Sequence, residues 1–188
     1  LKSLAEALQA ARAKPERVAY GSAGVGSTHH LAGELLSRMA GARLLHVPYK
    51  GAAASVTALL AGDLPMVIAP PTAVLGHLKA GKLRALAVTG PQRWPGMPEV
   101  PTVAEQGVAG FDVRSWAGWM LPAGTPMAIV ERLHAETQKA LQVAAVRQRL
   151  EEMGGEARGS TPQEMTAMVA AELQRWTQVV SDAKIARL

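Results

Sequence analysis

The chain has 188 residues, which is enough for one domain with a buried core, or for one domain and part of a second. Apolar residues make up 48% of it and charged residues 19%, so the composition excludes an intrinsically disordered protein. The lack of cysteine excludes thiol nucleophiles, CxxC redox sites, thiolate metal sites and disulfides, and it suits an exported protein that folds without oxidation.

The charge pattern argues against a nucleic-acid partner. Lys and Arg outnumber Asp and Glu by 20 to 15, but these charges are scattered singly, and aromatic residues that could stack on bases make up only 4%. A mildly positive field favours small anions as ligands. No apolar stretch reaches the roughly 18 residues of a membrane-spanning helix. Because the chain begins with Leu1 rather than Met, we expect a processed or trimmed product.

The first half of the sequence alternates short apolar segments with helical ones. After an opening helical turn that contains Leu4 and Leu8, a helix capped by Ser27 or Thr28 is expected to end at Gly41. The other elements predicted here are four strands and two helices, at residues 17–20, 44–47, 66–69 and 83–88 and at residues 52–61 and 73–80. This alternation is typical of an α/β fold with a largely parallel sheet.

The second half of the sequence has a different pattern. It predicts a proline-rich loop, a capping box, a strand and two long helices, at residues 90–101, 102–105, 113–121, 126–146 and 161–180. The last helix is opened by a second capping box, formed by Thr161 and Glu164. We therefore expect a domain boundary between Ser115 and Pro126.

The glycine-rich loop from Gly21 to Thr28 is the most informative segment. Its spacing is that of a phosphate-binding P-loop, but Ser27 stands where the lysine that neutralises the outer phosphates is required. The loop also fails as a dinucleotide-binding fingerprint, because His29 occupies the position of the third glycine. The sequence therefore predicts no nucleotide cofactor.

Anion binding is the chemistry that remains for this loop. A glycine-rich turn lets a ligand approach the backbone, and the helix after it presents unpaired N–H groups and the positive end of its dipole. Ser22, Ser27 and Thr28 add hydroxyl donors without charge, which suits a carboxylate that must be released again. The alternative is a tight strand–helix turn with a capping serine. Thr72 follows another apolar strand and either supplies a second donor or caps a helix.

Patterns for catalysis and metal binding are weak, and no residue is assigned to either role. No Gly-x-Ser-x-Gly segment is present, so no serine lies in a recognised nucleophile context. His30 and Glu34 are four residues apart but lack a third ligand, so a surface hydrogen bond or cap is favoured over a metal site. His46 is interpreted as a satisfied core or rim histidine.

Several further motifs follow one another along the chain. They are YGSAGVGS at 20–27, HLAGE at 30–34, HVPYKG at 46–51, GKLRALAVT at 81–89, VPT at 100–102 and PAGTP at 122–126. In this order and spacing, from about Val18 to Ile185, the chain resembles the solute-binding receptors of tripartite tricarboxylate transporters, the Bug or TctC-like family.

The resemblance implies a periplasmic receptor with a type II periplasmic-binding-protein-like fold, whose two α/β lobes close on a small mono-, di- or tricarboxylate. Its partners would be that ligand and the membrane permease subunits of the transporter, with no enzyme activity, cofactor, metal or nucleic acid. In the family, one carboxylate is held by a strand–helix loop from each lobe. The loop of the second lobe corresponds here to Ser22, Ala23, Gly24, Gly26, Ser27 and Thr28.

The resemblance also implies a domain division in which the first lobe is incomplete. Residues 1–17 would form a leading helix, residues 18–116 the second lobe, and residues 117–188 the crossover and C-terminal helices of the first lobe. The Pro-Gly-Gly loop of the family's first lobe has no counterpart here, so the chain corresponds to the C-terminal two-thirds of a receptor. We therefore expect exposed apolar helix faces, dimerisation or domain exchange, and weak carboxylate binding by this chain alone.

Two other functions remain open at this point. The ligand-sensing effector domain of a transcription regulator can share the two-lobe architecture, although no preceding helix-turn-helix is visible. An acyl or phosphoryl transferase would need a general base near Ser22 or Ser27, for which the sequence offers only His29 and His30.

Overall fold

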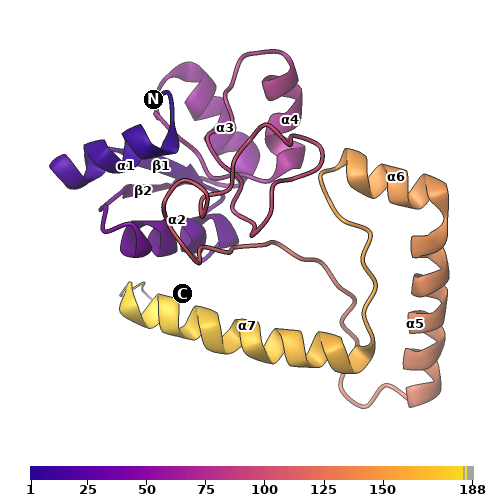
Figure 1. Cartoon of the computed structure of the whole chain (residues 1–188). Coiled ribbons are helices and arrows are strands. Elements are labelled where there is room, and N and C mark those ends of the chain that lie inside the picture. Colours follow the sequence, from indigo (N-terminus) through magenta and orange to yellow (C-terminus); the bar gives the residue numbers. More distant parts are fainter. Residues whose placement is uncertain (184, 186–188) are drawn as a thin grey trace. The chain divides into compact units, whose positions relative to one another are not determined.

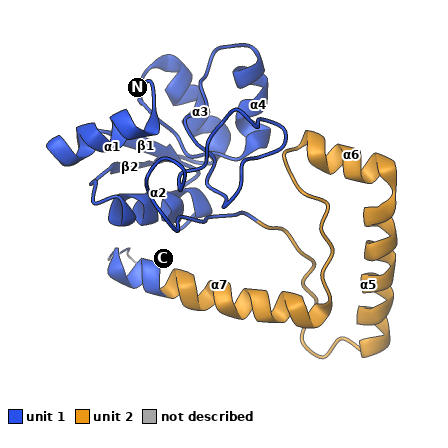
Figure 2. Cartoon of the chain, in the orientation of Figure 1, with its two compact units in different colours: residues 1–115, 178–188 blue, residues 116–177 orange. Residues whose placement is uncertain are grey.

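The computed structural model describes residues 1–183 and 185, and these contain two strands in one sheet and seven helices. The chain divides into two compact units (Figure 2). Unit 1 contains Leu1–Ser115 together with the described residues from Gln178 onward, and unit 2 contains Trp116–Thr177. The last helix therefore begins in unit 2 and ends in unit 1.

A small parallel sheet lies at the centre of unit 1 (Figure 1). Strand β1 (Ala19–Ser22) pairs in parallel with β2 (Leu45–Pro48). Two hydrogen bonds form on the other edge of β1, both at 3.0 Å. The N–H of Gly21 donates to the carbonyl of Met66, and the N–H of Ile68 donates to the carbonyl of Gly21. The strand predicted at residues 66–69 is thus reduced to a single parallel bridge beside β1.

Helices cover both faces of β1. Adjacent residues on a strand point to opposite faces of the sheet. The ring of Tyr20 lies against Gly33 of helix α2 (Thr28–Met39), whereas a Cβ on Gly21 would meet Ser55 of helix α3 (Ala52–Ala61) at 3.2 Å. Helices α2 and α3 therefore pack on opposite faces of β1, and Figure 1 shows them on the two sides of the strands.

Local sequence signals set the ends of these helices. Ser27 caps α2, since its Oγ accepts a hydrogen bond from the N–H of His30 at 3.3 Å, as expected. Gly62 ends α3 in the left-handed region with φ 86°, a conformation that favours glycine. The other helices of unit 1 are α1 (Leu4–Ala13) and α4 (Pro71–Lys79).

Unit 2 consists largely of helices, and here one prediction is wrong. Two helices, α5 (Met127–Gln142) and α6 (Ala144–Glu152), replace the single helix expected over residues 126–146. They are separated by Val143, whose backbone is extended with φ −70° and ψ 122°. Valine has a slightly lower helix propensity than unbranched residues because its side chain is β-branched. Neither glycine nor proline marks the break, so the sequence did not predict it. Helix α7 (Pro162–Asp182) follows and is opened by the predicted hydrogen bond from Glu164 N–H to Thr161 Oγ1.

Besides the segment 66–69, two further predicted strands do not form regular strands. The segment 83–88 has a single parallel bridge, from Val88 to Thr102, and the segment 113–121 has no strand. Trp119 within the latter is 80% exposed. Apolar composition alone does not make a strand, because a strand needs a hydrogen-bonded neighbour, and after Val113 this segment finds none among the described residues.

Candidate functional site

The glycine-rich loop connects the end of β1 to the start of α2. Gly24 and Gly26 have φ values of 130° and 76°, a region that side chains rarely adopt, so both positions require glycine. Backbone hydrogen bonds from the residues that follow β2 hold the loop in place. The N–H of Tyr49 donates to the carbonyl of Ser22, and the N–H of Gly51 donates to the carbonyl of Ala23, both at 3.2 Å. The motif at residues 46–51 is therefore part of the structure of this loop.

The first turn of α2 leaves donors available at the loop. Ser27 Oγ accepts from the N–H of His30 and donates to the carbonyl of Gly24 at 2.7 Å. The N–H groups of Thr28 and His29 open the helix and have no acceptor within it. Together with the positive end of the helix dipole, these two groups form an arrangement that suits an anion.

Ser22 is oriented toward the interior. Its side chain has no exposed surface, and its Oγ lies 2.7 Å from Nε2 of His46 while it accepts from the N–H of Gly24 at 3.1 Å. A serine hydroxyl beside an imidazole is the pairing that a serine nucleophile uses. A substrate carbonyl cannot approach this Oγ, because Ser22 is completely covered.

His30 is buried, which corrects the expectation of a surface residue. It is 6% exposed, and its Nδ1 accepts from the N–H of Gly26 at 3.1 Å. Its ring stacks on that of His46, with centroids 3.8 Å apart and planes 17° apart. His46 is partly buried and bonded to Ser22, so its interpretation as a satisfied histidine is confirmed. Burial, together with the neighbouring His30, lowers the pKa of His46 to about 4, and burial also lowers the pKa of His30.

Tyr20 and Glu34 complete this polar cluster beneath the loop. The Tyr20 hydroxyl lies 3.0 Å from Oε1 of Glu34 and 3.1 Å from the carbonyl of His30. Burial, and then the charge of Glu34, raise the pKa of Tyr20, so its hydroxyl keeps its proton and acts as a donor. The same Glu34 oxygen lies 3.7 Å from Nε2 of His30. A continuous set of contacts thus runs from Ser22 to Glu34, and it is polar except where the rings of His46 and His30 stack.

Of the predicted site residues, the structure joins all but one in a single loop. Thr72 is exposed and is the second residue of α4, whose N-cap is Pro70. The helix-cap alternative for Thr72 is therefore wrong. The six other predicted residues lie together between the end of β1 and the start of α2, namely Ser22, Ala23, Gly24, Gly26, Ser27 and Thr28.

His29, the residue after the loop, was considered from the sequence only as a candidate general base for a transferase. Nδ1 of His29 is buried and has no hydrogen-bond partner among the described residues. Burial lowers the pKa of His29, which favours the neutral ring. A buried nitrogen without a partner costs free energy unless water or a ligand meets it. In the sequence, His29 also stands out because it occupies the third-glycine position of a dinucleotide-binding fingerprint. That mismatch does not indicate that its Nδ1 is buried.

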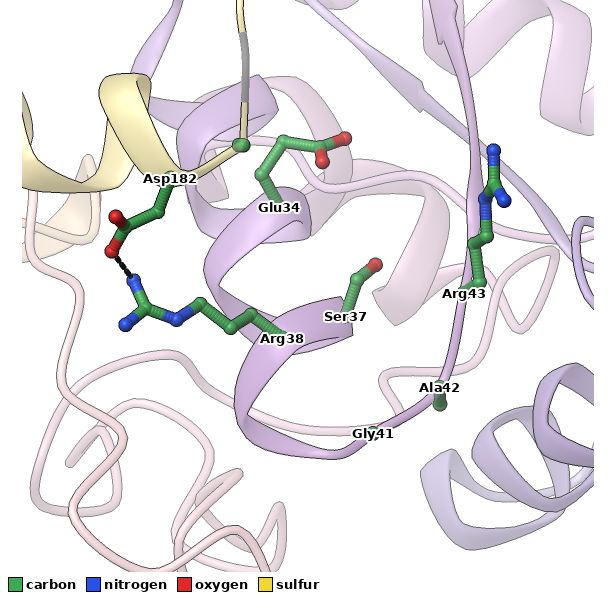
Figure 3. Close-up of a pocket in the computed structure, with 8 residues that line it drawn as sticks. Glu34, Ser37, Arg38, Gly41, Ala42, Arg43 and Asp182 are labelled. Atoms are coloured by element: carbon green, nitrogen blue, oxygen red, sulfur yellow. Dashed lines mark hydrogen bonds and ion pairs between the residues drawn. The ribbon is translucent and has the colours of Figure 1, made fainter.

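A hollow of about 360 Å³ lies at the other end of α2 (Figure 3). Helix α2 is about 18 Å long, so this hollow is well separated from the loop. Figure 3 shows Arg38 and Asp182 turned toward each other across it, and they form an ion pair. Arg43, on another wall, pairs with Glu16 at 2.8 Å. Because both arginines already have carboxylate partners, the hollow offers little to a free carboxylate.

Neither a membrane-spanning helix nor a metal-binding cluster is found among the described residues. No helix there combines the length and apolar character needed to cross a bilayer. No three His, Asp or Glu side chains in the same residues lie close enough together to hold a metal ion.

Comparison with known proteins identifies the family. The model of the tripartite tricarboxylate transporter family receptor matches residues 1–185. The chain belongs to this receptor family. Its fold is accordingly that of the periplasmic solute-binding proteins.

Three similar proteins show how much of a receptor the chain covers. A protein encoded in the tcbD-tcbE intergenic region of Pseudomonas sp. strain P51 is 38% identical over 98% of this chain and 55% of its own length. The structure of Rpa4515 from R. palustris with adipate has a TM-score of 0.90 and 38% identity, over 100% of this chain and 63% of that one. MatC from Rhodopseudomonas palustris with bound malate has a TM-score of 0.79 and 29% identity, over 97% and 62%. This receptor chain thus spans less than two-thirds of these relatives.

Proposed function

We propose that this chain is part of an extracytoplasmic, periplasmic solute-binding protein that captures a small carboxylate for the permease subunits of a tripartite tricarboxylate transporter. The observation that carries the proposal is the start of α2, where the N–H groups of Thr28 and His29 lack acceptors within the helix. Adipate and malate, the ligands of the two similar solved proteins, are both dicarboxylates. The contacts we propose are with Ala23, Gly24, Gly26, Ser27 and Thr28, with Thr72 as a further donor. Ser22, which the sequence also predicted as a contact, is completely buried and supports the loop through its hydrogen bonds.

The residues of the loop support binding rather than catalysis. A nucleophilic role for Ser22 is disfavoured by its complete burial. His30, the candidate general base, has Nδ1 engaged by Gly26 and lies beneath the loop. The transcription-regulator alternative is not favoured, because the family match and the similar solved proteins are receptors.

We further propose the domain division expected from the sequence, with residues 1–17 as the leading helix, 18–116 as the second lobe and 117–188 as the part belonging to the first lobe. Residues 184 and 186–188 of the last segment lie outside the described residues. Unit 1 and unit 2 meet along the chain between Ser115 and Trp116, close to the proposed limit of the second lobe.

The affinity expected of this chain alone is low. A helix terminus contributes about 0.3–2 kcal/mol to anion binding, and each hydrogen bond to a charged group contributes about 1.5–3 kcal/mol. Association costs at least about 4 kcal/mol. Two amide donors and the dipole thus give a net binding free energy of at most about −4 kcal/mol, which corresponds to a millimolar Kd. A receptor with both lobes would add the contacts made by the strand–helix loop of the first lobe.

Substitution of the helix cap tests the proposal. Asp and Asn both replace Ser well at an N-cap, but only Asp places a negative charge at the proposed carboxylate site. We expect Ser27→Asp to weaken the binding of adipate or malate at least about tenfold relative to Ser27→Asn, measured by NMR titration at millimolar concentrations. Adipamide, which has the shape of adipate without its charges, is the ligand control. Equal affinities in the two variants, or shifts with adipamide as large as those with adipate, would argue against a carboxylate at this loop.

A further inference from the structure

We propose that His30 and His46 are positioning residues for the carboxylate loop: the stacked imidazoles hold its Gly26 amide and its Ser22 hydroxyl from below. This inference rests on the proposed function of the loop, and it assigns a role to two residues that need not touch the ligand. The loop is thereby held at both ends, at Ser22 where β1 stops and at Gly26 just before the cap of α2.

The contact between His30 and Gly26 defines the state of the His30 ring. The N–H of Gly26 can donate to Nδ1 only when this nitrogen carries no proton. The neutral ring then carries its proton on Nε2, which lies on the side of Glu34, 3.7 Å from Oε1. A protonated His30 would present a donor to the Gly26 donor, so the contact requires the neutral ring. The low exposure of His30, 6%, favours that neutral form.

The contact between His46 and Ser22 acts at the other end of the loop. The separation of 2.7 Å between Nε2 and Oγ is short, and Ser22 Oγ in turn accepts from the N–H of Gly24. Loss of the imidazole would leave the buried Ser22 hydroxyl with only the N–H and the carbonyl of Gly24 as partners, at 3.1 and 3.2 Å, and would remove the link between the loop and β2 that runs through His46.

Stacking joins these two contacts into one unit. The rings of His30 and His46 lie on different elements, α2 and β2, with centroids 3.8 Å apart. Tyr20 fixes the pair from the strand side, since its ring centroid lies 5.1 Å from that of His46 and its hydroxyl bonds the carbonyl of His30. The positions of the loop donors thus depend on how α2 packs on the sheet.

A crossed set of substitutions tests this role in the 188-residue chain. The side-chain oxygen of Asn lies close to the position of histidine Nδ1, whereas the amide of Gln reaches the position of Nε2. His30→Asn therefore keeps an acceptor for Gly26, and His30→Gln removes it. At His46 the pattern is reversed, because His46→Gln keeps a partner for Ser22 and His46→Asn removes it. His77→Gln on α4 is a control outside the loop.

Each expected result reports on one hydrogen bond or on one ring nitrogen. We expect hydrogen exchange of the Gly26 amide to be about tenfold faster in His30→Gln than in His30→Asn, and adipate to bind several-fold more weakly in His30→Gln and His46→Asn than in their crossed partners. In the unsubstituted chain, nitrogen NMR of the rings should find Nδ1 of His30 unprotonated and Nε2 protonated at pH 7. This last measurement needs no variant and is independent of whether the variants fold.

The results that overturn the proposal are equally distinct. A protonated Nδ1 on His30, or Gly26 exchange that is the same in both His30 variants, shows that the pair does not position the loop. Failure of adipate to shift any loop resonance in the unsubstituted chain counts against the proposed function, while the ring and exchange measurements still decide the positioning role.

Discussion

Gly33 of α2 lies directly against the phenol ring of Tyr20 on β1. A Cβ at this position would overlap the ring, and the ring is held in place by hydrogen bonds from its hydroxyl to Glu34 and to the carbonyl of His30. The close approach of helix and strand therefore depends on the missing side chain.

We expect Gly33→Ala to destabilise the protein by about 1–3 kcal/mol, because the overlap with Tyr20 outweighs the better helix propensity of alanine. The matched control is Gly76→Ala in α4, where a Cβ would meet nothing within 4 Å. That change should stabilise by about 0.5–1 kcal/mol. Chemical denaturation measures both, and a stabilised Gly33→Ala variant would contradict the packing described here.

Stability should fall as the pH drops from about 6.5 toward 4. Burial lowers the pKa of His46 to about 4 and lowers the pKa values of His29 and His30. Between these values and 6.5, the unfolded chain binds more protons than the folded one, so stability is complete above 6.5 and declines through this range. Denaturation midpoints between pH 7.5 and 4 measure the decline.

Removal of one histidine separates this effect from the carboxylates that also titrate in acid. His46→Gln retains a partner for Ser22 Oγ but cannot be protonated, so its stability should decline less steeply between pH 6.5 and 4 than that of the unsubstituted chain. An identical pH dependence in the two proteins would show that His46 is not held neutral by the fold.

The end of α7 should contribute to the stability of unit 1. Val179 is 6% exposed and lies in the part of α7 that belongs to unit 1. Val179→Ala should cost about 1–3 kcal/mol through the loss of buried methyl groups and the space they leave. Gln174→Ala, at an exposed position earlier in the same helix, should change stability by less than about 0.5 kcal/mol. Equal effects would mean that the end of α7 is not packed as described.

The isolated chain should self-associate at micromolar concentration. Unit 2 exposes large apolar side chains, of which Trp119 is 80%, Leu173 68% and Met127 63% exposed. Exposed apolar surface of this kind favours association. Light scattering should give a mass above 19.7 kDa, and Trp119→Ser with Met127→Gln should lower it. A monomer throughout the micromolar range would refute this prediction.

The sequence predicted the features that depend on local chemistry. The bounds of α3, the cap at Ser27 and the capping box of Thr161 and Glu164 all agree with the structure. Glycine, proline and short polar side chains act on their own backbone within a few residues, so their effects can be inferred without knowledge of the fold. The loop that joins β1 to α2 belongs to the same class of local signals.

Features that depend on distant partners could not be predicted in the same way. Residues 113–121 have the composition of a strand but find no neighbouring strand among the described residues. The burial of His30 depends on His46, which is sixteen positions away and on a different element. Their shared location follows only once β1 pairs with β2 and places Tyr20 opposite His46.

The division of unit 1 between residues 1–115 and the end of α7 also has a consequence for biosynthesis. Val179 and Asp182, which pack on or pair with unit 1, are translated only after all of unit 2. At about 5–20 residues per second, translation of unit 2 takes about 3–12 seconds, and residues 1–115 wait at least this long for the segment that completes unit 1. During this interval the part of unit 1 that the end of α7 later covers, including Arg38, stays exposed on the nascent chain.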